Sequence, residues 1–132
     1  MIHHNTTTVN EIVEHYLVAA CWASVGDNGE PLDEKYSADD FTRDARAKVT
    51  RAVKRFIELA LADLEKLPDD FDNAQIGHDL FLTTAGHGVG FWDRDLGELG
   101  ERLTAHAKAS HYVESAYECG NNRHLHIWIE GV

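Results

Sequence analysis

The chain has 132 residues, of which 43% are hydrophobic and 27% are charged, a composition that favours one ordinary globular domain. Twenty-three acidic and twelve basic residues give a formal net charge of -11, which disfavours direct binding to nucleic acid phosphates or to anionic lipid. The two cysteines, Cys21 and Cys119, are too few for a secreted disulfide framework. No apolar run approaches the roughly 20 residues of a membrane helix, so we expect a cytoplasmic protein without membrane contact.

A first helix is predicted to begin at Thr8, because Thr8 and Glu11 have the spacing of a capping box. Apolar residues then recur every three or four positions to about Val25, which gives this helix one apolar face. That stripe contains Val9, Ile12, Val13, Tyr16, Leu17, Ala20 and Cys21. Residues 1–8 are expected to be disordered, and the acidic, glycine-containing segment 26–35 is expected to form a loop.

A second, long helix is predicted by an apolar stripe that runs from Phe41 to Leu67. Ser37 and Asp40 form an N-cap signal before it, and Pro68 ends it. At about 1.5 Å per residue, some 27 residues reach roughly 40 Å, which is the full width of a small domain.

A β-hairpin is predicted next, because the hydrophobic period changes from helical to alternating after Gly77. Its two strands would be HDLFLTT, residues 78–84, and HGVGFWD, residues 87–93. Ala85 and Gly86 between them are typical of a turn.

A short third helix and a second hairpin complete the predicted fold. Asp95 and Glu98 have capping-box spacing before the helix, and the strands of the hairpin would be residues 112–118 and 124–130. We therefore predict a single α+β domain over 1–132, with two N-terminal helices, a hairpin, a short helix and a hairpin, whose strands form a small antiparallel sheet.

Histidines near the predicted strands raise the question of a metal site. His78, Asp79 and His87 could converge if the first hairpin pairs as predicted, and His124 and His126 would share a strand face. No HExxH or CxxC motif accompanies them. We favour hydrogen-bonding histidines and predict no metal, cofactor or catalytic residue, with a small metal-dependent or nucleotide-directed enzyme at this strand region as the alternative.

The end of the first predicted hairpin carries a tryptophan beside two charged residues. Trp92, Asp93 and Arg94 could form a binding corner, or Asp93 could cap the next helix while Arg94 pairs on the surface. Gly86, Gly88 and Gly90 alternate before them, and we favour close packing over phosphate binding because no helix follows the glycines directly.

Charge is distributed unevenly along the chain. Six of the twelve basic residues lie between Arg43 and Arg55, with one acidic residue among them, and acidic residues gather on both sides. Two such patches could imitate the spaced phosphates of a duplex and occupy a basic groove of another protein. The alternative is a solvated face that only aids solubility. The candidate partner-binding residues are Asp27, Glu30, Asp33, Glu34, Asp39, Asp40, Asp63, Glu65, Asp69, Asp70 and Asp72.

The segment GHDLFLTTAGHGVGFWDRDLGELGERLTAHAKA resembles a signature of small uncharacterised proteins from tailed bacteriophages and prophages. YLVAACW and YSADDF upstream are similar to the same family, so the resemblance covers about residues 16–118. It implies a phage origin and a compact α+β fold, without implying a reaction. The residues that match its motif, and that we select as a candidate site, are His78, Asp79, His87, Gly88, Gly90, Trp92, Asp93 and Arg94.

Acidity and phage resemblance together favour a non-enzymatic protein that binds a host factor in the host cytoplasm. The expected partner has a basic, nucleic-acid-binding surface, as a restriction or CRISPR component has, and the protein would act in host takeover or counter-defence as a DNA mimic, for example as an anti-CRISPR or anti-restriction inhibitor. Direct contact with nucleic acid is not expected. We expect a monomer or a homodimer, and an oligomeric module that uses the long helix as its seam is a further alternative.

Overall fold

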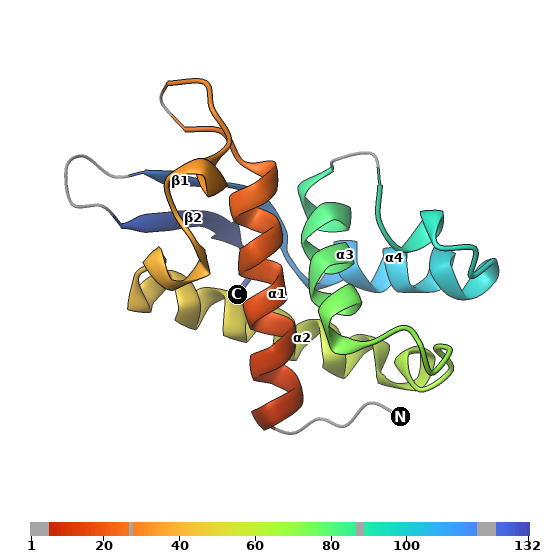
Figure 1. The fold of residues 1–132 in the computed structure, drawn as a ribbon. Coiled ribbons are helices and arrows are strands. Elements are labelled where there is room, and N and C mark those ends of the chain that lie inside the picture. Colours follow the sequence, from red (N-terminus) through yellow and green to blue (C-terminus); the bar gives the residue numbers. More distant parts are fainter. Residues whose placement is uncertain (1–5, 27, 87–88, 119–123) are drawn as a thin grey trace.

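The computed structural model describes residues 6–26, 28–86, 89–118 and 124–132, in which four α-helices precede a C-terminal β-hairpin (Figure 1). The helices are α1 (Thr6–Ala23), α2 (Arg43–Leu64), α3 (Asn73–Ala85) and α4 (Glu98–Ser110). The strands are β1 (Tyr112–Glu118) and β2 (Leu125–Glu130). Three short 3-10 helices lie in the connections: η1 (Leu32–Glu34), η2 (Ala38–Asp40) and η3 (Phe91–Asp93).

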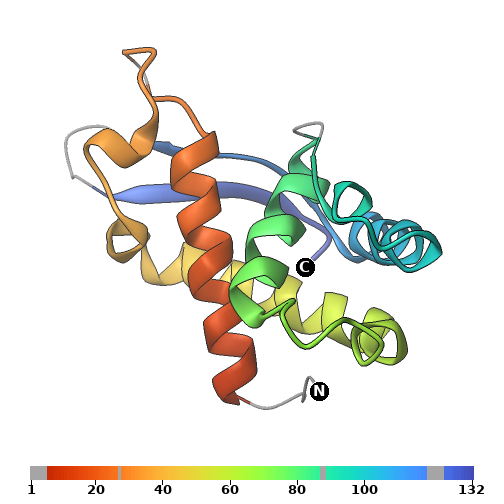
Figure 2. The ribbon, with the colours of Figure 1, turned by 45° about the vertical axis from the view of Figure 1, so that its right-hand side comes forward.

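Helices α1 and α3 lie side by side and run in the same direction (Figures 1 and 2). Gly77 of α3 faces the backbone of α1, where a Cβ atom would stand 3.0 Å from the Tyr16 nitrogen and overlap the Ile12 carbonyl oxygen. A glycine at this position therefore allows the two helices to approach closely. The rings of Tyr16 and Phe81 meet edge to face across the contact, with centroids 5.4 Å apart.

Helix α2 crosses the α1–α3 pair and packs against α4 through its C-terminal half (Figure 2). Its buried stripe contains Val49, Val53, Phe56, Ile57 and Ala60, as the helical period predicts. Thr42 caps the helix by accepting a hydrogen bond from the Ala45 amide at 3.0 Å. The helix ends at Leu64 rather than at Leu67, so its 22 residues span about 33 Å.

The C-terminal hairpin forms where the sequence predicts it. β1 and β2 pair antiparallel with an irregularity between Val113 and Ser115. Leu125 and Ile127 point into the core, whereas His126 between them is half-buried and Trp128 after them is exposed, which is the alternation expected of a half-buried strand. The hairpin is fixed to the rest of the molecule by hydrogen bonds from the Thr42 amide to the Leu125 oxygen and from the Ala116 amide to Ser24 Oγ, both 3.0 Å.

The predicted hairpin over residues 78–93 is wrong, and the predicted fold class of two hairpins in one sheet is wrong with it. Residues 78–84 lie inside α3, whose side chains from Ile76 to Thr84 are almost all buried. A short segment that is apolar on most sides is compatible with a strand and with a buried helix. Its hydrophobic period therefore does not distinguish the two. The helix signals lie at its ends, where Asp72 accepts a hydrogen bond from the Gln75 amide at 2.9 Å and Gly86 closes the helix with φ 72.

The described part of the second segment, residues 89–93, contributes a short loop and η3 instead of a strand. Phe91 is buried there and stacks on Phe56 of α2, with ring centroids 5.7 Å apart. The burial of one aromatic side chain, rather than strand pairing, therefore holds this segment to the core. The sheet has two strands among the residues that the structure describes.

Three predicted helix starts also need correction. Helix α1 begins at Thr6, so residues 6–8 are helical rather than disordered, and residues 1–5 lie outside the described part. The predicted capping box before α4 is wrong, because the N-cap is Gly97 and it makes no side-chain cap bond. The capping box of Ser37 with Asp40 is present, but it starts η2 rather than the long helix.

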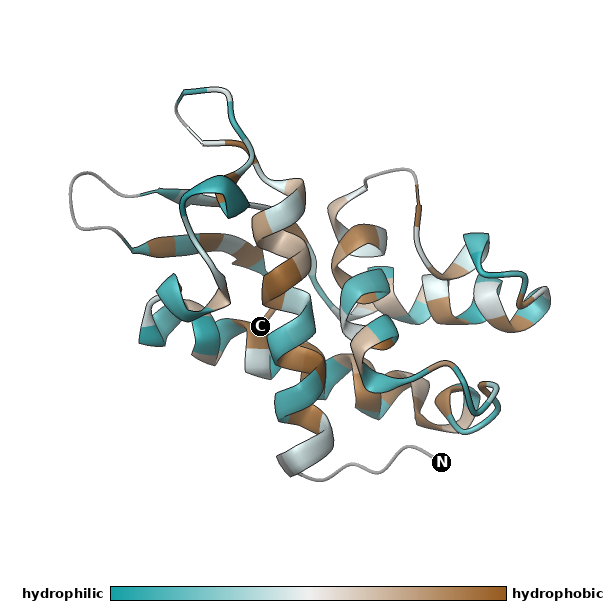
Figure 3. Ribbon diagram, in the orientation of Figure 1, coloured by the Kyte–Doolittle hydropathy of each residue, from teal (hydrophilic) through white to brown (hydrophobic). Residues whose placement is uncertain are grey.

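Apolar residues gather between the helices, and hydrophilic residues dominate two connections, η1 to η2 and the turn between α2 and α3 (Figure 3). The core includes residues from all four helices and both strands. None of the described helices combines the length and the apolar character that a bilayer crossing requires.

Candidate binding surface

The first group of candidate acidic residues lies on the connection between α1 and α2. Glu30, Asp33, Glu34 and Asp39 are exposed and Asp40 is half-exposed, and we call these five residues the first acidic cluster. Asp27 lies outside the described residues. A hydrogen bond to Glu30, together with the negative charge of Glu30, raises the pKa of Glu34. The carboxylates in this cluster are therefore close enough to repel each other.

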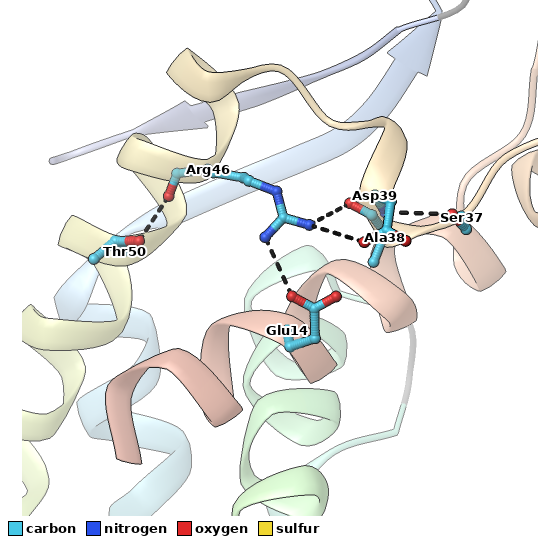
Figure 4. Close-up of polar contacts among 6 residues, drawn as sticks. All are labelled: Glu14, Ser37, Ala38, Asp39, Arg46 and Thr50. Atoms are coloured by element: carbon cyan, nitrogen blue, oxygen red, sulfur yellow. Dashed lines mark hydrogen bonds and ion pairs between the residues drawn. The ribbon is translucent and has the colours of Figure 1, made fainter. Parts of the chain in front are cut away.

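Arg46 of α2 holds η2, and with it part of the first acidic cluster, against α1 (Figure 4). Its guanidinium donates to the Ala38 carbonyl at 2.7 Å and to the Glu14 carboxylate at 3.2 Å. The carboxylate of Asp39 stands farther away, at 3.9 Å, and its side chain is 91% exposed. Asp39 therefore keeps most of its charge available to solvent or to a partner.

The second group lies at the turn between α2 and α3. Glu65, Asp69, Asp70 and Asp72 are exposed, and we call them the second acidic cluster. Asp72 also caps α3.

Asp63 is buried and paired within the molecule, so the second acidic cluster is defined without it. Its carboxylate meets His106 Nε2 at 2.9 Å and accepts from Arg102 Nε at 3.0 Å. The hydrogen bond with His106, and next the bond and charge of Arg102, hold the pKa of Asp63 below its ordinary value. Asp63 thus connects α2 to α4.

The exposed face of α2 separates the two acidic clusters with positive charge. Arg43, Arg51, Lys54 and Arg55 are all exposed along this helix. Asp39 and Asp40 of the first cluster directly precede α2, and the second cluster follows its C-terminal end (Figure 1). This side of the molecule does not present a continuous row of negative charge.

A groove runs across the surface of α1, from the connection that holds η1 and η2 to α3. It consists of two adjoining pockets of about 380 Å³ each that share Val18 and His78. One pocket is lined by Val18, Cys21, Trp22, Asp33, Tyr36, Ser37, Ala38 and His78, and the other by His15, Val18, Asp72, Ala74, Gln75 and His78. This α1–α3 groove therefore extends from Asp33 in the first acidic cluster to Asp72 in the second.

The wall of the groove is aromatic. Trp22 is 57% exposed, and its ring stands 5.8 Å from the ring of His78. Tyr36 is held by a hydrogen bond from its hydroxyl to Glu118 Oε2 at 2.8 Å. Burial lowers the pKa of His78, against the opposing influence of Asp79, which favours the neutral imidazole.

The thiol of Cys21, in the groove wall, has a raised pKa. Burial raises the pKa of Cys21 to about 12, and the negative charges of Asp33 and Asp40 contribute to the same shift. The thiol is free and buried, and at neutral pH it stays protonated. The groove wall therefore combines uncharged side chains with carboxylates at its two ends.

The candidate motif residues that the structure describes do not form one site. Asp79 is fully buried and accepts a bidentate pair of hydrogen bonds from Arg94, at 3.0 Å from Nε and 2.7 Å from Nη2. His78, the preceding residue on α3, faces the groove instead, because neighbouring helical residues point about 100° apart. Trp92 and Asp93 are exposed on η3, and the Lys108 ammonium lies 6.0 Å from the Trp92 ring centroid. His87 and Gly88 lie outside the described residues.

Metal-ligating side chains are not clustered in the described part of the chain, where no group of three or more His, Cys, Asp or Glu residues is placed to hold an ion. His126 stacks on Tyr117 across the hairpin, with centroids 5.5 Å apart. Asp79, the carboxylate of the enzymatic alternative, is engaged with Arg94.

A buried polar chain joins Tyr16, His111 and Ser110. Ser110 Oγ donates to the Ala107 oxygen at 2.7 Å, so it accepts from His111 Nδ1, also at 2.7 Å. His111 Nε2 then accepts from the Tyr16 hydroxyl at 3.0 Å. The serine hydroxyl therefore accepts a hydrogen bond from the histidine instead of donating one to it. In an activated serine nucleophile the hydroxyl donates to the histidine, so this arrangement is the reverse.

The prediction from sequence missed the groove residues Val18, Trp22 and Tyr36. Val18 and Trp22 fall outside the apolar stripe of the first predicted helix, and a tryptophan outside such a stripe indicates an exposed aromatic surface. Tyr36 carries no comparable signal, because its place depends on the fold of η1 and η2 around α1.

No family model, no curated protein and no solved structure matches the chain. The resemblance to phage proteins therefore stays a prediction from its motif. Function has to be inferred from the charges and from the groove.

Proposed function

We propose that the protein is a non-enzymatic acidic binding protein of phage type that inhibits or modulates a nucleic-acid-handling protein of the host by occupying the basic surface of that partner. One observation carries this proposal. Four exposed carboxylates of the first acidic cluster lie within the segment 30–39, and two of them are so close that one raises the pKa of the other.

Crowded like charges lower stability, so their presence on an exposed connection calls for a compensating role. A basic partner supplies the missing positive charge, accelerates encounter by electrostatic steering and fixes the orientation of the complex. The net charge of -11 adds a long-range attraction to the same kind of partner.

Inhibition of the partner follows from occupation of its nucleic-acid-binding surface. A basic surface that binds nucleic acid is built to receive spaced negative charges. The two acidic clusters, connected by the α1–α3 groove, offer such charges to it without offering a phosphodiester bond to cleave. A bound copy of this protein would therefore exclude nucleic acid from the partner.

Affinity capture from a bacterial host lysate, at low and at physiological ionic strength, tests the proposal. The test variant carries Glu30→Gln, Asp33→Asn and Glu34→Gln, and it leaves Asp40 intact because Asp40 Oδ2 accepts from the Ser37 amide and caps η2. The matched control carries Glu58→Gln, Glu101→Gln and Glu114→Gln, three exposed residues outside both clusters.

We expect the wild type and the control to capture a nucleic-acid-binding protein that duplex DNA displaces, and the test variant to lose it. Capture that is insensitive to salt, or equal for both triple variants, contradicts the proposal.

A further inference from the structure

We propose that the α1–α3 groove binds an extended, arginine-bearing segment of the basic partner, with one guanidinium seated between Trp22 and Asp33. This inference rests on the proposed function and specifies its chemistry. The groove joins both acidic clusters, so a segment lying along it meets carboxylates at each end.

Trp22 gives the first reason for an arginine. Its indole is more than half exposed on the groove wall, and an indole face attracts a cation placed within about 6 Å of its centre. Guanidinium is planar and weakly hydrated, so it stacks on such a ring more readily than an ammonium does.

Asp33 gives the second reason. It lines the same pocket as Trp22 and is exposed, so a carboxylate stands at the rim where a stacked guanidinium would present its N–H groups. Arginine pairs with a carboxylate through two parallel hydrogen bonds. After burial, the charges of Asp33 and Asp40 also contribute to the raised pKa of the Cys21 thiol in the same wall.

The apolar lining between these groups suits the rest of the side chain. Val18, Cys21 and Ala38 line the pocket with apolar or uncharged surface, which the three methylene groups of an arginine would cover. His78 forms the boundary to the second pocket, and its lowered pKa favours the neutral imidazole, which does not repel the incoming cation.

The second pocket explains why the occupant is an extended segment rather than a single residue. It continues from Val18 and His78 to the exposed carboxylate of Asp72. A second basic residue of the same segment would meet Asp72 there.

Tryptophan fluorescence tests this inference with a defined probe. The chain has three tryptophans, and Trp92 and Trp128 are exposed, so replacing both by phenylalanine leaves Trp22 as the only tryptophan reporter. The probes are a short peptide of alternating arginine and glycine, and its citrulline counterpart, which keeps the shape and lacks the charge. Asp33→Asn is the test variant, and Asp70→Asn is the matched control in the second acidic cluster.

We expect the arginine peptide to change Trp22 emission saturably and the citrulline peptide to leave it unchanged. Loss of a cation–carboxylate contact of about 1 kcal/mol corresponds to roughly fivefold weaker binding for Asp33→Asn, and Asp70→Asn should bind as the wild type does. Equal effects of the two substitutions, or equal binding of both peptides, would overturn the groove inference while salt-sensitive capture still supported the proposed function. Failure of that capture would instead overturn the proposed function.

Discussion

Asp79 and Arg94 form the tightest charged contact among the described residues, and it explains why an acidic residue can stand inside α3. The carboxylate is fully buried, whereas the guanidinium side chain is 34% exposed. Asp79 raises the pKa of Arg94 further above its ordinary value. The pair links the loop after η3 to α3, so its role is structural.

We predict that Arg94→Met destabilises the protein by about 3–5 kcal/mol, because it leaves a buried carboxylate without a partner. Asp79→Asn with Arg94→Met should cost much less than the two single substitutions added together. Denaturant unfolding measures these differences. Arg43→Met, at an exposed arginine, is the control and should stay within about 0.5 kcal/mol of the wild type. A loss below 1 kcal/mol for Arg94→Met would show that the pair does not matter for stability.

His111 makes stability depend on pH. Burial lowers the pKa of His111 from 6.5 to about 4, and the groups facing its ring nitrogens are the hydroxyls of Tyr16 and Ser110. Above pH 6.5 the imidazole is neutral in the folded and in the unfolded chain. Below pH 6.5 the imidazole is protonated in the unfolded chain but stays neutral in the folded chain until about pH 4. The free energy of unfolding therefore falls as pH falls.

The predicted loss from His111 is about 3 kcal/mol between pH 6.5 and pH 4. Chemical denaturation at a series of pH values measures it. His111→Asn should flatten the slope in this window whatever its effect on stability at pH 7, and His15→Asn, at an exposed histidine, should keep the slope. An unchanged slope in His111→Asn would assign the pH dependence to other groups.

At the scale of elements, the close packing of α1 on α3 depends on Gly77. In an exposed helix, alanine in place of glycine stabilises by roughly 0.5–1 kcal/mol. Here the added methyl group would overlap the Ile12 carbonyl oxygen, so the sign should reverse. We expect Gly77→Ala to destabilise by about 1–3 kcal/mol and Gly77→Val by more. Thermal unfolding of the graded pair tests this, and a stabilised Gly77→Ala would contradict the packing described.

The sequence predicts the elements whose two faces differ. The long amphipathic stripe of α2, the shorter one of α1 and the alternation in the C-terminal hairpin all identify their elements. The sequence pattern fails at α3, because the residues from Ile76 to Thr84 are buried except for His78 and therefore show no regular polar face. The residues at its two ends, Asp72 and Gly86, indicate a helix, but the alternation of residues 78–84 favours a strand.

The candidate site was predictable in its charge but not in its shape. The exposed acidic residues follow from composition and loop position, with Asp63 as the exception because Arg102 and His106 of α4 reach it only in the folded chain. The α1–α3 groove depends on the contact between two helices, one of which was predicted as a strand. No sequence pattern could therefore have placed Trp22 and His78 together.

At the scale of the whole molecule, charge is sorted by location. The two connections that end the α1–α3 groove carry the acidic clusters, and four exposed basic residues, Arg43, Arg51, Lys54 and Arg55, lie along α2. A partner with a basic surface should approach the groove side and avoid the α2 side. On the proposed function, this charge pattern would orient the complex.

The association rate constant with the captured partner, measured over a range of ionic strength, tests the central claim most directly. For the wild type we predict a rate constant that falls steeply as salt rises, and for Glu30→Gln/Asp33→Asn/Glu34→Gln a slower rate with a much flatter salt dependence. The triple control variant at Glu58, Glu101 and Glu114 should keep most of the steepness. A rate constant that does not change with ionic strength, or the same slope in both triple variants, would contradict recognition through the first acidic cluster.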